Sequence, residues 1–328
     1  MNKKIIANVC LFLTAIIWGF SFVAQVLGSD VIDPFSFNAI RFGVGAVSLI
    51  PVMLLLEKRP RGKLSAEQNA DDRRKLRTTV IAAAVCGTIL FGASTLQQMG
   101  AQITKSPGRA GFITDLYIIL TPLFATLVFR RKLCPTVFAG AVLALAGIYL
   151  LCIKPGEGFS FGSGEMLIFL GSFFWAFHIL AIDRFGSKIY HLRFSCLQFI
   201  VVSVESALFA VIFEHTTLAM VWQARWAIFF CGVLSVGIAY TLQTIGQRMS
   251  DPSYAAIVFS LEAVFGAIGG VIFGQDTFST AGIVGCVLIF AGIVLSQLTI
   301  GKKRPKTLSK HRIGTKINLR FIDTGKKP

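Results

Sequence analysis

Ten apolar segments, separated by mostly short polar stretches, run along the chain. Each segment is close to the ~20 residues that a helix needs to cross ~30 Å of hydrocarbon, and about twice as long as a barrel strand. Inside a bilayer every backbone amide needs a hydrogen-bond partner, and a helix supplies that partner internally. The pattern therefore predicts an all-α membrane protein with ten transmembrane helices. The predicted spans are residues 5–27, 34–56, 78–99, 107–129, 135–153, 164–182, 194–213, 226–245, 252–274 and 280–298.

The second five segments repeat the first five. The sequence around Trp18 aligns with the sequence around Trp175 at an offset of 157, and residues 96–100 align with residues 242–246 at an offset of 146. Such a change of the offset along the chain is expected after a duplication when the loops of the two halves differ in length. Because each half holds five spans, an odd number, the second half must enter the membrane from the opposite side. Inverted repeats of this kind are typical of secondary transporters.

The predicted organisation is therefore two inverted five-helix repeats followed by a tail. The repeats cover residues 5–153 and 164–298, and residues 299–328 form a basic cytoplasmic tail.

Composition agrees with a multi-pass membrane protein, since 54% of the residues are hydrophobic, 15% are charged and the mean hydropathy is +0.71. The net charge of +16 would also suit a nucleic-acid binder, so the distribution of the charges along the chain decides between the two classes. Of the 32 Lys and Arg residues, 27 fall on one side of the predicted membrane if the N-terminus is inside. This bias follows the positive-inside rule and places both termini in the cytoplasm of an inner-membrane protein. No nucleic-acid partner is predicted.

Five short motifs, in order along the spans, resemble the EamA-type carriers of the drug/metabolite transporter superfamily from about residue 5 to residue 298. The motifs are Trp18-Gly19, Arg41-Phe42, Trp175-Ala176, Asp183-Arg184 and Ser260-Leu261-Glu262. The resemblance implies ten helices in two inverted repeats, with a central cavity lined by spans one to four and six to nine. It also implies export or exchange of small metabolites, often amino acids, without ATP. Where the family often has proline after the Ser-Leu-Glu run, this chain has Ala263, so the sequence leaves open whether the helix breaks there.

Two charged residues of opposite sign lie at matched depth within predicted spans. Arg41 is seven residues into span two and Asp115 eight residues into span four, both counted from the outer face. At 1.5 Å per residue each lies roughly 10–12 Å below that face. Burying a charge in a bilayer costs about 2.5–3.5 kcal/mol even on lenient scales, so we expect the two residues to pair. Such a pair would be either a structural salt bridge or part of a gate or substrate site.

Glu205 and Glu262 lie near mid-depth in spans seven and nine, which contain no cationic residue. A buried carboxylate without a cation can take up a proton near neutral pH, as a proton-coupled carrier requires. Glu205 has an alternative role as a hydrogen-bond acceptor from neighbouring serines. Glu262 aligns with Tyr117 at an offset of 145, so both halves place a polar group there, and we expect Glu262 to face the cavity.

Aromatic residues are the remaining candidates for the site. Trp18 and Trp175 occupy equivalent deep positions in the two repeats, and Tyr117 and Tyr240 also lie within spans. They either line a pocket at the pseudo-twofold axis or simply pack. His178 shares a helix face with Trp175 and either contacts substrate or bonds to a helix carbonyl. Its spacing to other ligand-type residues predicts no metal site, and seven scattered cysteines predict neither disulfides nor a metal. No cofactor is predicted.

Glycines within the spans predict close helix packing. In span nine Gly266, Gly270 and Gly274 form two overlapping G-x-x-x-G steps. Spans five and ten carry glycine strips that suit either an internal seam or a homodimer. The strips are Gly140 and Gly147 in span five, and Gly285 and Gly292 in span ten.

One sequence match suggests an enzyme, because residues 158–162 fit the G-x-S-x-G nucleophile motif. That motif needs a strand before it and a helix after it within an α/β sheet, whereas here it lies in a loop between membrane helices. No Walker A loop is present. The sequence therefore predicts a carrier rather than an enzyme: an inner-membrane exporter of small organic metabolites, with amino acids as the expected substrates, working by alternating access. The alternatives are a multidrug efflux carrier, a metabolite uptake carrier, or a membrane-embedded enzyme of cell-envelope or lipid metabolism.

Overall fold

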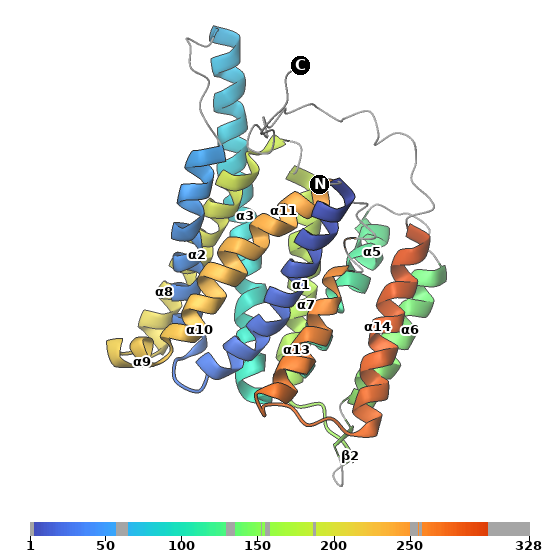
Figure 1. Ribbon diagram of the computed structural model, residues 1–328. Helices are drawn as coiled ribbons and strands as arrows, with labels where there is room; N and C mark the ends of the chain where they lie inside the picture. Colours follow the sequence, from blue (N-terminus) through green and yellow to red (C-terminus); the bar gives the residue numbers. More distant parts are fainter. Residues whose placement is uncertain are drawn as a thin grey trace, which may run out of the picture.

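The computed structural model describes residues 3–56, 65–128, 135–151, 153–154, 158–185, 188–249, 255 and 258–300. Helices dominate these residues and run roughly alongside one another, with the start of α1 and the end of α14 at the same end of the bundle (Figure 1). The first-half elements are α1 (Lys3–Gly28), α2 (Pro34–Leu56), α3 (Ala66–Thr104), α4 (Pro107–Thr114), α5 (Tyr117–Val128), α6 (Pro135–Leu151), β1 (Ile153–Lys154) and β2 (Gly158–Phe159). The second-half elements are α7 (Ser163–Phe185), α8 (His191–Phe213), α9 (Leu218–Gln223), α10 (Arg225–Phe229), η2 (Phe230–Ala239), α11 (Tyr240–Met249), α13 (Leu261–Ile272) and α14 (Thr280–Ile300).

The structure confirms the predicted class of helical, multi-pass membrane protein. Among the described residues, six helical runs are long and apolar enough to cross a bilayer, and three shorter apolar helices accompany them. The six runs are Lys4–Gly28, Pro34–Leu54, Ala66–Thr104, Ser163–Ile182, His191–Phe213 and Arg225–Gln243. The shorter helices are Pro135–Leu151, Leu261–Ile272 and Thr280–Ser296.

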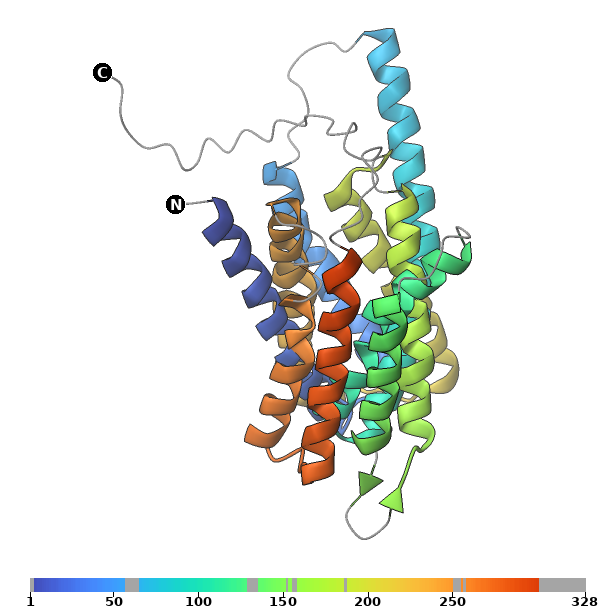
Figure 2. The same ribbon diagram turned by 90° about the vertical axis from the view of Figure 1, so that its right-hand side faces the viewer.

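One predicted span is longer in the structure, because α3 begins at Ala66 and not at residue 78. Figure 2 shows this helix projecting beyond its neighbours. The added turns are polar, so hydropathy did not reveal them. Ser65 and Gln68 begin the helix with a reciprocal capping box, which satisfies two backbone N–H groups that would otherwise have no partner.

Three other predicted spans are interrupted, and in the one at 252–274 a turn at Ser260 precedes α13. The span at 107–129 is divided by a tight turn at Asp115 and Leu116, where Leu116 N–H donates to the Ile113 carbonyl oxygen, 3.3 Å away. The span at 226–245 begins as α10, continues as the π-helix η2 and ends as α11. The predicted loop between spans five and six contains a short antiparallel pair, β1 with β2. The G-x-S-x-G residues thus fall on a two-residue hairpin strand and the turn after it, and not in an α/β sheet.

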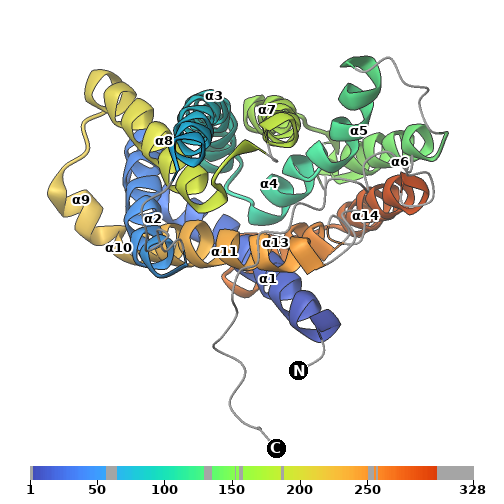
Figure 3. The ribbon, with the colours of Figure 1, turned by 90° about the horizontal axis from the view of Figure 1, so that it is seen from above.

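Seen along its axis, the bundle has a helix pair at each edge (Figure 3). α6 packs against α14 at one edge and α2 packs against α8 at the other. Helices α1, α3, α4, α7 and α13 lie between these pairs.

The α6–α14 contact is built on the predicted glycine strips. A Cβ atom placed on Gly140 would lie 2.5 Å from the carbonyl oxygen of Gly292, and one placed on Gly285 would lie 2.5 Å from that of Gly147. Such distances leave no room for a side chain, so the backbones are in direct contact. Of the two alternatives left open by the sequence, the structure uses the strips as an internal seam.

The glycine row of span nine has three different roles and not the single packing face that was predicted. Gly266 lies against Gly19 and Pro107, at the crossing of α13 with α1 and α4. Gly270 makes room for the side chain of Asp276 in the following turn. Gly274 has a φ of +70° and sits in open space, so it is a turn residue.

Candidate functional site

Two buried carboxyl groups lie side by side where α13 passes the turn between α4 and α5. Asp115 is 0% exposed and Glu262, in the first turn of α13, is 5% exposed. The two side chains lie within electrostatic range of one another, and within the described part of the chain neither carboxylate oxygen of Asp115 has a hydrogen-bond partner. Within the described part of the chain the ion pairs are Lys105–Asp30 and Arg109–Glu165, so neither buried carboxyl group has a cationic partner there.

Arg41 does not pair with Asp115 among the described residues, so the predicted ion pair is wrong for this structure. Its Nε donates to Oδ1 of Asn38, 2.8 Å away, and its guanidinium carbon lies 4.9 Å from the ring centre of Phe42. Matched depth was the basis of the prediction, but depth does not determine which way a side chain points around its helix. The turn at Asp115 directs the carboxyl group towards α13 and Glu262.

Two tyrosines lie near the carboxyl pair, and one of them, Tyr240, also lies near the arginine. Tyr240, the first residue of α11, lies within electrostatic range of both Arg41 and Glu262. Tyr117, the first residue of α5, lies within range of Glu262, Asp115 and Tyr240. The structure therefore gathers five of the predicted residues into one polar cluster, which we call the central cluster: Arg41, Asp115, Tyr117, Tyr240 and Glu262.

The two predicted tryptophans form aromatic walls beside the central cluster. The ring centre of Trp18 lies 5.2 Å from that of Tyr240, and the ring centre of Trp175 lies 6.4 Å from that of Tyr117. All four rings are half-buried. Half-buried rings around fully buried acids suit recognition of a small molecule with an apolar part.

A network of buried glutamines next to Trp175 was not predicted as part of the site. Gln97 Nε2 donates to Oε1 of Gln25, 3.0 Å away, and Gln98 Nε2 donates to the backbone oxygen of Gln25, 3.1 Å away. Trp175 Nε1 donates to Oε1 of Gln97, 2.9 Å away. The signal in the sequence was a pair of consecutive glutamines within an apolar span, which served there only to align the repeats. Amides at this depth need partners, and here they connect α1, α3 and α7.

His178 lies behind Trp175, with ring centres 6.0 Å apart, and its Nε2 is 3.1 Å from Oε1 of Gln198. Its partner is therefore a side chain of α8 and not the helix carbonyl that the sequence allowed. No group of three or more His, Cys, Asp and Glu side chains that suits a metal occurs within the described ranges.

Glu205 stands apart from the central cluster. Its Oε1 accepts a hydrogen bond from Thr88 Oγ1, 2.6 Å away, at the contact of α8 with α3. Of the neighbouring serines that the sequence offered as partners, Ser203 instead donates to the carbonyl oxygen of Ala39. Glu205 is thus the one predicted site residue that the structure places elsewhere.

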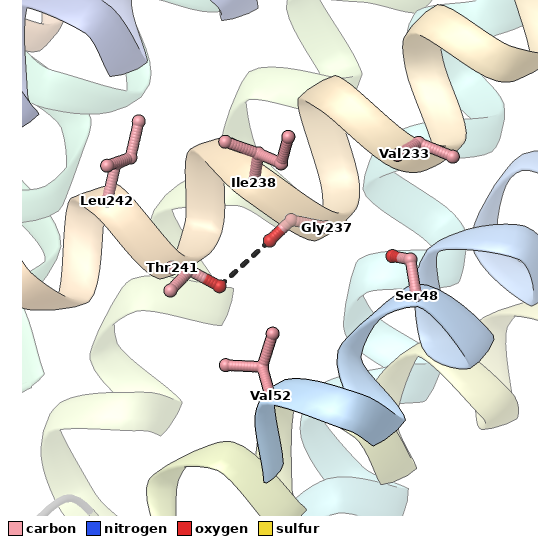
Figure 4. Close-up of a pocket in the computed structure, with 7 residues that line it drawn as sticks. All are labelled: Ser48, Val52, Val233, Gly237, Ile238, Thr241 and Leu242. Carbon is pink, nitrogen blue, oxygen red and sulfur yellow. Dashed lines mark hydrogen bonds between the residues drawn. The ribbon is translucent and has the colours of Figure 1, made fainter. Parts of the chain in front are cut away.

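Two shallow hollows lie on the flanks of α2 and not at the central cluster. One, of about 180 Å³, lies between α2 and η2–α11 and includes Ser48 and Ile238 (Figure 4). In the same view Thr241 donates to the carbonyl oxygen of Gly237. The other, of about 210 Å³, lies between α2 and α8. Both are lined mainly by apolar side chains, as expected of surfaces that face lipid.

Polar contacts tie the helix ends together at the end of the bundle that carries β1 and β2. The carboxylate of Asp276 accepts from Ser106 Oγ and from the N–H of Gly108, 2.7 Å away, at the start of α4. Arg109 Nη1 lies 3.0 Å from Oε1 of Glu165 on α7. Burial raises the pKa of Asp276. The hydrogen bonds from Ser106 and Gly108 and the charge of Arg109 act in the opposite direction and lower this pKa. The loop before α14 thereby holds α4 in place.

A model of the EamA-like transporter family matches residues 5–153 and 162–298. The chain belongs to the EamA-like transporter family. The resemblance noted from the sequence is thereby confirmed, and the chain is a multi-pass membrane transporter.

Similar proteins agree with this family. An uncharacterized transporter of Archaeoglobus fulgidus is 24% identical over 298 residues, which cover 91% of this chain and 88% of the relative. The aromatic amino acid exporter YddG of Ancylobacter novellus is 26% identical over 200 residues, covering 58% of this chain and 67% of the exporter. The match to one solved crystal structure covers 90% of this EamA-family chain and 97% of the chain in that structure. Its TM-score of 0.64, at 21% sequence identity, shows a shared fold.

Proposed function

We propose that this EamA-family transporter is a secondary-active exporter of amino acids or closely related metabolites, working by alternating access around the central cluster. The observation that carries the proposal is the central cluster itself, in which two buried acids, an arginine and two tyrosines are flanked by tryptophans. The exporter activity of YddG, a relative, points to the same substrate class.

Two inverted five-helix repeats, at residues 5–153 and 164–298, are the architecture that we propose for alternating access. Reciprocal contacts at aligned residues support it. Gly100 of α3 packs on Ile168 and on the carbonyl oxygen of Gly164 in α7. Its counterpart Gly246 of α11 packs on Leu11 and on the carbonyl oxygen of Ala7 in α1.

The residues contacted in the second repeat by Gly100 lie 157 positions after those contacted in the first repeat by Gly246. This is the same offset that aligns Trp18 with Trp175. At the α6–α14 seam, the first glycine of each strip likewise meets the second glycine of the other. Reciprocal contacts of this kind are the mark of a twofold relation between two surfaces.

The charges of the central cluster suit a zwitterion. Arg41 would bind the substrate carboxylate, and the acidic pair would bind its ammonium group. Trp18 and Tyr240 would contact an apolar or aromatic side chain, for which ring stacking adds about 0.5–1.5 kcal/mol. Hydrogen bonds to charged groups are each worth about 1.5–3 kcal/mol, so this arrangement would discriminate against neutral solutes.

The acidic pair would also provide coupling to a proton gradient. As a general scale, two like unit charges at about 4 Å repel one another by about 4 kcal/mol at an effective dielectric constant of about 20, so two buried carboxylates near one another are costly. Holding one proton between Asp115 and Glu262 relieves this repulsion. We propose that substrate and proton exchange at this pair, which makes transport independent of ATP.

Flux in proteoliposomes tests the proposed function. The purified protein is reconstituted and offered radiolabelled aromatic amino acids, aliphatic amino acids, sugars and amphipathic cations. We expect saturable flux of amino acids without ATP, and its loss when an ionophore collapses the proton gradient. Flux of amphipathic cations alone would instead identify a multidrug carrier, and no flux with any of the four classes would contradict a carrier of this kind.

Reporter fusions test the proposed topology. A reporter fused after Lys302 is expected in the cytoplasm, and one inserted within residues 156–164 is expected outside, because each repeat crosses the membrane five times. The readout is a pair of enzymes that are active on opposite sides of the inner membrane. A single reporter on the wrong side would contradict the inverted repeat.

A further inference from the structure

The two repeats differ by one residue inside the third helix of each half. Cys86-Gly87 aligns with Cys231-Gly232 at an offset of 145. A few residues further along, Ala93 aligns with Ala239, and the offset there is 146. The second repeat thus has one extra residue within a helix, so loop lengths alone do not explain the change of offset between the repeats.

The extra residue coincides with the π-helix η2. A π-helix closes i→i+5 hydrogen bonds, so it accommodates a single inserted residue within an α-helix, frequently at a functional site. Gly92 still aligns with Gly237, which places the insertion at Ile238. Ile238 is 43% exposed, whereas Ala93 and Ala239 are both fully buried. An added residue that points outwards leaves the buried positions of the two halves equivalent.

Helix packing in the first half is achieved without this residue. Before the insertion, Gly232 packs on the Arg41 carbonyl oxygen of α2 as Gly87 packs on the Gln198 carbonyl oxygen of α8, again at partner residues 157 apart. After the insertion, Gly246 packs on α1 as Gly100 packs on α7. Since α3 makes both contacts as a regular α-helix, packing of the bundle does not explain the extra residue.

What the π-helix changes is the central cluster. The carbonyl oxygen of Ser235 in η2 accepts a hydrogen bond from Trp18 Nε1, 3.3 Å away, and that of Ala239 accepts one from Thr14 Oγ1, also 3.3 Å away. Tyr240 follows the last residue of the π-helix, and its ring lies against those of Trp18 and Phe199, at 5.2 Å and 5.0 Å between centres.

The other half holds its tryptophan differently. Trp175 is bonded to the side chain of Gln97, and the residue aligned with Tyr240 in α3 is the fully buried Ser94. The insertion therefore marks the place where the two halves of the site differ.

We propose that Ile238 is a positioning insertion: the π-helix that it creates sets Trp18 and Tyr240 as the substrate-contacting wall of the central cluster. Ile238 acts through these two residues and does not touch the substrate. The proposal rests on the proposed function for its transport readout and has a second readout that does not.

Deletion of Ile238 tests the proposal, with deletion of Ala93 as the matched control. Without Ile238 the segment regains the spacing of α3, so the protein is expected to reach the membrane and to unfold at a near-normal temperature. Its KM for the best amino acid is expected to rise about ten-fold, the effect of losing about 1.4 kcal/mol of ring contact and hydrogen bonding, with little change in maximal rate. Deletion of Ala93 removes a residue that α3 cannot spare, and should leave little folded protein.

Fluorescence of Trp18 gives the readout that does not depend on transport. Trp175→Phe, Trp222→Phe and Trp226→Phe together leave Trp18 as the only tryptophan. Deleting Ile238 in this background is expected to shift the Trp18 emission maximum, because the indole N–H loses its carbonyl partner.

The proposal is overturned if deletion of Ile238 leaves both KM and emission unchanged, or if it removes folded protein as completely as deletion of Ala93 does. If the normal protein carries no amino acid, the proposed function fails while the emission shift still decides whether Ile238 positions Trp18.

Discussion

Glu262→Gln is expected to lower the rate of transport to about a tenth of normal or less, with the normal amount of protein in the membrane. Glutamine retains the size of the side chain and its hydrogen bonding but cannot hold a negative charge or exchange a proton. Hydrogen bonds to a charged group are worth about 1.5–3 kcal/mol, which corresponds to roughly a 10- to 150-fold change. The measurement is initial flux in proteoliposomes across a range of pH.

The pH profile gives this prediction its second part. In the normal protein the rate should fall at alkaline pH, where the Asp115–Glu262 pair loses its shared proton. Glutamine cannot take up or lose a proton in this range, so the profile of Glu262→Gln should flatten. Asp115→Asn is expected to behave similarly, since each change removes one half of the pair.

Glu205→Gln is the matched control. It removes another carboxyl group within a span, but one that is bonded to Thr88 at the α3–α8 contact, away from the central cluster. It should transport near the normal rate. Normal transport and a normal pH profile in Glu262→Gln, with loss in Glu205→Gln, would move the site of coupling to Glu205.

Gly285→Ala is expected to destabilise the protein strongly. The added methyl group would lie 2.5 Å from the carbonyl oxygen of Gly147 and 2.7 Å from the backbone nitrogen of Leu151. These neighbours are backbone atoms, so the two helices must separate before the methyl group fits. Overpacking of this kind typically costs about 1–3 kcal/mol. We expect a lower unfolding temperature for the detergent-solubilised protein.

Gly282→Ala in the same helix is the control for helix propensity. Its added methyl group would meet the nearest side-chain atoms at 3.4–3.6 Å, which is ordinary van der Waals contact. Alanine favours a helix over glycine by about 1 kcal/mol, so this variant should be as stable as the normal protein or more so. Equal stability of both variants would show that the seam can open without cost. The glycine strips are used within one chain, so they no longer support the homodimer, which stays a prediction without them.

The sequence by itself was sufficient for the membrane class and for the five residues that the structure gathers into the central cluster. A bilayer requires long apolar helices and makes each buried charge costly, so both features can be read from single positions along the chain. This is why Arg41, Asp115 and Glu262 stand out as candidates from their places within apolar spans alone. The aligned tryptophans followed from the internal repeat, which is also visible in the sequence.

Which of these residues meet was decided only by the tertiary structure. Which side chains meet depends on the rotation of each helix about its axis and on local departures from α-helix. The length of an apolar segment in the sequence reveals neither of these. Asp115 lies beside Glu262 and not Arg41 because the chain turns between α4 and α5. Trp18 Nε1 donates to the carbonyl oxygen of Ser235, which lies within the π-helix η2. The Gln25–Gln97 bond joins residues 72 positions apart, and no local pattern predicts such a contact.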